Sequence, residues 1–221
     1  MAFSVLLNLF ILTIGSGIFI YDYQRFPSSY EDGFTSDLIR RRFAGGISLD
    51  NGGNFAIDDS PTSGQYVGNP SPEIDSSWDK LSAGLNIDLG GSDANDLDGK
   101  TFQWPDSDKY FTGLEVFHSL HCLNRLRQAL YPDYYTVFDD PIDPSREAHI
   151  GHCINHLRQA LQCHADLTPM NWKLVGNKLI LDTNAMHTCR DFDAIHDWVF
   201  QRRTNYYEKE AVVNGSILIV D

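Results

Sequence analysis

Residues 118–130 read HSLHCLNRLRQAL, and residues 149–161 read HIGHCINHLRQAL. The two stretches align without a gap and agree at nine of thirteen positions, which indicates one structural unit used twice and not a long repeat array. Each copy carries two histidines three residues apart, followed directly by a cysteine. The chain is therefore organised around a duplicated HxxHC motif.

The spacing of the motif places its polar residues on one face of a helix. Residues three or four apart are neighbours on a helix surface, so His118, His121 and Cys122 share a face. Aliphatic residues form an apolar stripe beside that face in both copies. They are Leu123, Leu126, Leu130, Ile154, Leu157 and Leu161. We expect each helix to bury this stripe and to present its imidazoles in a cleft at the edge of the core.

Two such helices offer four imidazoles, from His118, His121, His149 and His152. Imidazole suits copper, zinc, iron and nickel. Two amphipathic helices with ordinary surface histidines are the alternative, but the duplication of the histidine pair favours a metal site.

The choice of metal follows from the residues around the pair. Di-iron proteins built on helices use Glu-x-x-His twice. Glu115 stands at that spacing before His118, but Arg146 occupies the matching position before His149. An all-imidazole site is therefore favoured, and copper in such a site performs one-electron and dioxygen chemistry. Zinc, which has no redox chemistry, is the alternative.

Length and composition set the domain organisation. The chain has 221 residues, enough for one domain with tails. A formal net charge of −13 argues against nucleic-acid binding, which needs a basic surface. We divide the chain into an apolar segment over 3–21, an irregular linker over 22–75 and a metal-binding domain over 76–221.

The apolar run 3–21 predicts a transmembrane anchor, because it carries no charge and is long enough to span a bilayer. A cleaved signal peptide is the rival interpretation. Basic residues follow the run, which alone would leave the domain in the cytoplasm. Four cysteines and a glycosylation sequon at Asn214 favour the lumen of the secretory pathway instead. We therefore expect a single-pass membrane protein with a lumenal, glycosylated domain.

The domain itself reads as mainly α. Thr112 and Glu115 form a capping box, which predicts a first helix over 113–130. Asp143 as N-cap and a following proline open a second helix that runs to Cys163. A hairpin with its turn at residues 176–177 and a third helix over 191–203 complete the predicted fold.

The four cysteines suggest disulfides. Cys153 and Cys163 lie ten positions apart on one predicted helix and cannot bond to each other. Of the two remaining schemes we favour Cys122 with Cys153 and Cys163 with Cys189, because duplicated positions can meet across a pseudo-twofold contact. A metal-bound thiolate is the secondary interpretation.

Two further histidines compete as an additional metal ligand. His156 shares the face of the second motif, but Arg125 is its counterpart in the first copy. It also lies two turns from His149, too far for one ion to bind both residues. His187 precedes the third helix, and a bond between Cys163 and Cys189 would bring it to the end of the second. We therefore expect His187, and not His156, to be the additional ligand.

These motifs resemble the UstYa family of fungal oxidases. The resemblance is carried by four segments and by the apolar N-terminal run. The segments are PEIDSSWDKL at 72–81, VFHSLHCLNRLR at 116–127, HCINHLRQALQCHAD at 152–166 and HTCRDFDAIHDW at 187–198.

The resemblance implies an oxidase that cyclises, hydroxylates, desaturates or chlorinates a peptide-like metabolite in a mycotoxin pathway, with copper as its metal and zinc or iron as alternatives. It places His187 at the family's later histidine position. The remaining alternatives are a redox-silent zinc protein and a non-catalytic subunit that pairs with an active paralogue.

Overall fold

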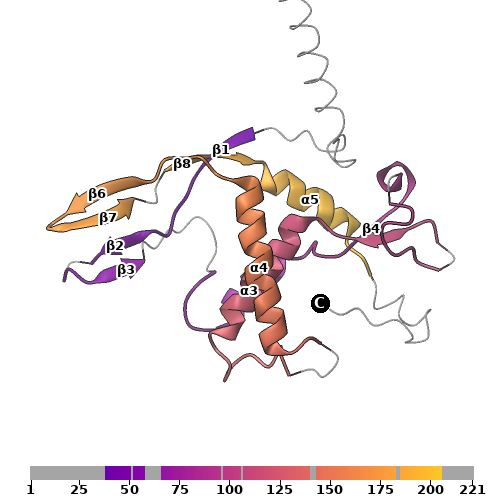
Figure 1. The fold of residues 1–221 in the computed structure, drawn as a ribbon, viewed down its shortest axis with the longest axis horizontal. Helices are drawn as coiled ribbons and strands as arrows, with labels where there is room; N and C mark the ends of the chain where they lie inside the picture. Colours follow the sequence, from indigo (N-terminus) through magenta and orange to yellow (C-terminus); the bar gives the residue numbers. More distant parts are fainter. Residues whose placement is uncertain are drawn as a thin grey trace, which may run out of the picture.

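The computed structural model describes residues 38–50, 52–57, 66–95, 97–105, 107–139, 143–182 and 185–205. Within them the chain forms helices, a short 3-10 helix and strands (Figure 1). In chain order these are β1 (Leu38–Arg42), β2 (Ile47–Leu49), β3 (Phe55–Ile57), α2 (Pro72–Leu81), β4 (Ile87–Leu89), η2 (Gly91–Ala94), β5 (Tyr110–Thr112), α3 (Glu115–Ala129), α4 (Arg146–His164), β6 (Asn171–Val175), β7 (Lys178–Asp182), β8 (Met186–Arg190) and α5 (Phe192–Arg202).

The prediction of a mainly α fold is wrong. The strands of the described residues pair antiparallel in four two-stranded sheets, β1–β8, β2–β3, β4–β5 and β6–β7. Only β6–β7 was predicted. β1 lies in the range predicted as an irregular linker, yet Arg41 pairs with His187 of β8. Long-range pairing of this kind leaves no local periodicity in the sequence, because the partner strand lies far along the chain.

The predictions of a transmembrane helix and of a single-pass, lumenal location are wrong as well. No helix among the described residues is long and apolar enough to cross a membrane. The apolar run 3–21 and the sequon at Asn214 lie outside the described residues.

Helices α3 and α4 cross in the middle of the molecule and pack against each other (Figure 1). Their N-termini differ from the prediction. Thr112 belongs to β5, so α3 begins at Glu115 without a side-chain cap. The cap of α4 is Ser145, whose hydroxyl accepts from the backbone N–H of Ala148.

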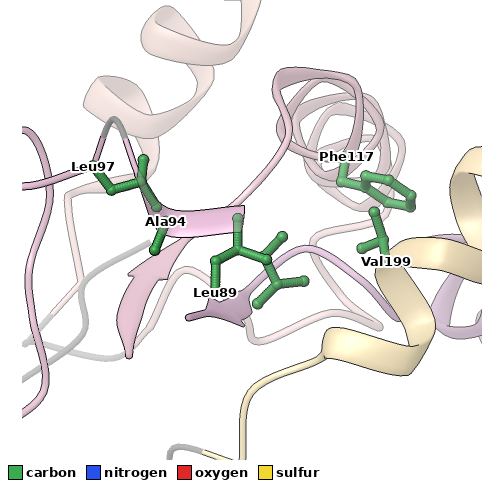
Figure 2. Packing of buried hydrophobic residues seen from close by; sticks show 6 residues of the cluster. Leu89, Ala94, Leu97, Phe117 and Val199 are labelled. Carbon is green, nitrogen blue, oxygen red and sulfur yellow. The ribbon is translucent and has the colours of Figure 1, made fainter. Parts of the chain in front are cut away.

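The apolar core lies beside α3 and joins it to α5. Its buried residues are Ile87, Leu89, Ala94, Leu97, Phe117 and Val199. Figure 2 shows Phe117 and Val199 side by side, with Leu89 between them and Ala94. This core holds the first half of α3, from which His118 projects, in a fixed position.

A polar network fastens the other half of α3 to α2. The Arg127 guanidinium donates to a carboxylate oxygen of Asp75 at 2.8 Å and to the Tyr135 hydroxyl at 2.6 Å. That hydroxyl donates to the same oxygen of Asp75 at 2.7 Å. Trp78 lies beneath the guanidinium and donates its indole N–H to the Tyr66 carbonyl. Segment 72–81, which the sequence singles out, thus anchors α3.

The predicted burial of the aliphatic stripe is wrong for four of its six residues, and the other two, Leu126 and Leu157, are half-buried. Leu123, Leu130, Ile154 and Leu161 are all exposed. The motif cysteines Cys122 and Cys153 and two motif histidines are buried instead. A cysteine is small, so two helices that meet through cysteines can approach closely. The two helices therefore pack against each other through the face that carries the motif.

Candidate metal centre

The crossing of α3 and α4 sorts the four motif histidines into two pairs. The rings of His118 and His152 stack with centroids 5.2 Å apart, and those of His121 and His149 stack at 5.8 Å. Exchange of the two motif copies turns one pair into the other, because His118 corresponds to His149 and His121 to His152. The repeat thus builds two related histidine pairs.

The first pair, His118 and His152, is accessible to solvent, and we call it the open pair. The two Nε2 atoms are 3.2 Å apart. The Sγ atom of Cys122 lies 3.8 Å from Nε2 of His118. Two imidazole nitrogens that bind one ion at about 2.0–2.1 Å each lie roughly 3 Å apart. The spacing of these donor atoms therefore fits a single metal ion.

The second pair is closed to solvent. His121 and His149 are 9% and 5% exposed, and we call them the buried pair. The Phe138 ring meets His149 edge-on, with centroids 5.8 Å apart. Because neither ring is accessible, dioxygen and a substrate reach the open pair much more readily than the buried one.

Glu115 and His156, which have no like residue at the matching positions of the other copy, adjoin the open pair. The His156 ring lies 4.1 Å from the His118 ring, between centroids. A carboxylate oxygen of Glu115 is 3.6 Å from Nδ1 of His118 and 3.7 Å from Nε2 of His156. Nε2 of His156 is also 3.0 Å from the Ser119 hydroxyl. Burial lowers the pKa of His156, and the neighbouring His118 lowers it further.

His187 lies in a different setting. Its ring stacks on Phe43 with centroids 3.6 Å apart, and its Nδ1 is 2.6 Å from a carboxylate oxygen of Asp166. Hydrogen bonds from Thr168, followed by the one from His187, lower the pKa of Asp166 to about 2. Of the two candidates for an additional ligand, His156 contacts the open pair. The role of His187 as a ligand stays a prediction.

The remaining site residues have separate environments. His164 bonds to the Ala160 carbonyl at the end of α4, and His196 bonds to the Lys80 carbonyl. Cys163 is exposed and Cys189 half-buried. The disulfide pairings stay a prediction.

A hollow of about 930 Å³ opens beside the start of α3. Leu114 and Val116 flank Glu115 in its wall, and the first residues of α5 contribute Phe192 and Ile195. Its size is that of a small-molecule pocket. Neither open-pair histidine lines the hollow, but Leu114 in its wall lies about one helical turn before His118 along the chain.

Sequence reasoning missed the placement of Glu115 and His156. A signal existed, since both stand where the two copies differ. The counterpart of Glu115 is Arg146, and that of His156 is Arg125. The departures from the repeat therefore meet at one end of the helix pair.

The site is a paired-histidine centre on two crossed helices. The family model described as "Mycotoxin biosynthesis protein UstYa" matches residues 2–202, and this chain belongs to that family. The UstYa family oxidase phomYd of Diaporthe leptostromiformis is 34% identical over 71% of this chain and 55% of its own length. The UstYa family oxidase phomYc of the same fungus is 35% identical over 66% and 60%.

A third relative, the oxidase ustYa of Aspergillus flavus, is 38% identical over 41% of each chain. The chain thus spans little more than half the length of the first two relatives. No solved structure matches this chain.

Proposed function

We propose that this chain is a copper-dependent oxidase that acts on a peptide or peptide-derived metabolite in a mycotoxin pathway. The observation that carries the proposal is the open pair, whose two Nε2 atoms lie 3.2 Å apart at the surface of the helix crossing. Family membership supports an oxidase, because the relatives bear that name.

The donor atoms favour copper over a hard cation. Imidazole and thiol donors suit copper, zinc and iron, whereas magnesium and calcium take oxygen ligands. His118 and His152 would hold the ion, with Cys122 as a further donor where its sulfur is a thiol. Copper supplies one-electron and dioxygen chemistry when bound. Zinc in the same place would supply no redox chemistry.

The protein positions the substrate and the histidines. The core residue Phe117 fixes the first half of α3, and Arg127 fixes the second half to α2. The hollow beside Leu114 and Val116 offers apolar walls to an organic substrate.

Two measurements test this proposal. Elemental analysis of the full chain, purified without added metal, should find copper and not zinc. In a producing fungus, deletion of the gene should remove an oxidised metabolite and accumulate its reduced precursor. Wild-type protein and the control His196→Gln should restore the product, and His118→Ala or His152→Ala should not. Zinc alone in the purified protein, or full rescue by both alanine variants, would overturn the proposal.

A further inference from the structure

The open pair has a second group of donor atoms on its other side. Glu115, His118 and His156 each contribute one donor atom, and these atoms lie within 4.8 Å of one another. Two histidines and one carboxylate are a ligand set that divalent transition metals accept, with positions left open. This group shares only His118 with the group formed by His118, Cys122 and His152.

The distances in this group suit a shared ion better than direct hydrogen bonds. The Glu115 oxygen lies 3.6 Å from Nδ1 of His118 and 3.7 Å from Nε2 of His156. Direct N–H···O bonds span about 2.7–3.2 Å, so both gaps are too long. Two ligands with metal bonds of about 2.0–2.2 Å lie roughly 3–4 Å apart when the angle between them is open. The Glu115 carboxylate therefore lies at distances from His118 and His156 that suit three ligands of one metal ion.

The two nitrogens of His118 face different groups. Its Nε2 is near His152 and Cys122, at 3.2 and 3.8 Å. Its Nδ1 is the atom nearest to Glu115. One imidazole can bind two ions through its two nitrogens once the ring has lost its N–H proton to solvent. His118 is thus placed to belong to both groups.

The repeat supplies an internal comparison. Exchange of the two copies turns Glu115, His118 and His156 into Arg146, His149 and Arg125. The second copy thus has two arginines where the first has a carboxylate and an imidazole, and arginine stays charged and has no acceptor for a metal ion. In the structure Arg146 donates to the Ala129 carbonyl and Arg125 to the Gln128 side chain. The matching positions of the second copy therefore offer only His149 as a ligand, and the second site has no counterpart there.

We propose that Glu115, His118 and His156 form a second site for a divalent transition-metal ion, joined to the open-pair site through His118. This inference rests on the proposed function, which supplies the first ion. The Glu115 side chain is 82% exposed and the His156 side chain 18% exposed, so the second ion lies at the solvent-exposed rim of the centre.

Metal titration tests the second site. Full-length protein, stripped of metal, is dialysed against copper(II), and bound copper is counted by elemental analysis. Glu115→Gln and His156→Gln should each bind one ion fewer than wild type, as should His152→Ala. His118→Ala should lose both ions of the centre. The control is His196→Gln, which should bind as many ions as wild type, because its ring bonds to the Lys80 carbonyl.

Paramagnetic resonance gives a second readout. Two copper(II) ions joined by one imidazole ring couple magnetically, so fully loaded wild type should give less signal than its copper content predicts. Glu115→Gln should restore a full signal for the ion that remains. Because Glu115 is exposed, this variant should fold normally, which circular dichroism checks.

Three outcomes would overturn the second site in distinguishable ways. Unchanged copper counts in Glu115→Gln and His156→Gln would remove it and leave the open-pair site standing. An unchanged count with affinity reduced 10- to 100-fold would mean that Glu115 only orients His118, which is the cost expected for losing such a partner. No copper bound by wild type would overturn the second site and the proposed function together.

Discussion

Arg127→Ala tests how the repeat is fixed to the rest of the fold. The Arg127 side chain is 10% exposed and that of Asp75 is 30% exposed. Removal of the guanidinium leaves the carboxylate and the Tyr135 hydroxyl without their cationic partner, and it removes the group stacked on Trp78. Breaking a fully buried ion pair costs about 3–5 kcal/mol, and a charged hydrogen bond contributes about 1.5–3 kcal/mol. Because Asp75 is partly hydrated, we expect a loss of about 2–4 kcal/mol.

The matched control is Arg158→Ala, at the same position of the second copy. Arg158 is exposed and bonds within its own helix, to Asn155 and Gln162. Such surface contacts contribute little, so its loss should change stability by less than about 0.5 kcal/mol. Urea unfolding followed by tryptophan fluorescence measures both variants. Equal effects of the two substitutions would refute the view that the first copy alone is anchored through Asp75.

Two further predictions concern the start of α3 and the acid range. Gly113→Ala should destabilise the fold by about 1–3 kcal/mol in the same assay, because the new Cβ would collide with the Leu85 carbonyl; an unchanged midpoint would refute the close contact. The pKa of Asp166 is about 2 against an ordinary 3.8, so its ionised form stabilises the fold above pH 4. That stabilisation is lost as the pH falls toward 2. Asp166→Asn, which weakens the contacts with Thr168 and His187, should remove this part of the acid dependence. An acid-unfolding curve identical to that of the wild-type protein would contradict this prediction.

Local patterns in the sequence predicted the elements that carry the motif. The spacing of His118, His121 and Cys122 correctly placed them on one helical face. The turn between β6 and β7 was also predicted from the sequence at residues 176–177. In the structure Gly176 adopts a positive φ of 61°, a conformation that favours glycine. Both features depend on residues close together in the chain, which is why the sequence alone reveals them.

Burial and long-range pairing escaped prediction. Hydrophobicity assigned Leu123 and Leu130 to the core, but the helices meet through the histidine and cysteine face and leave both leucines exposed. β1 pairs with β8 although neither segment has a strand-like alternation. The meeting of Glu115 with His156 depends on how two helices cross, which no spacing within one helix specifies.

The most direct test of the account is the copper(II) paramagnetic resonance spectrum of the full chain with one equivalent of metal, labelled with ¹⁵N-histidine. Copper bound at the open pair should show nitrogen coupling from two imidazoles, lost or halved in His118→Ala and in His152→Ala and unchanged in the control His196→Gln. A spectrum without histidine nitrogen, or one that neither alanine variant alters, would contradict a redox metal at the open pair.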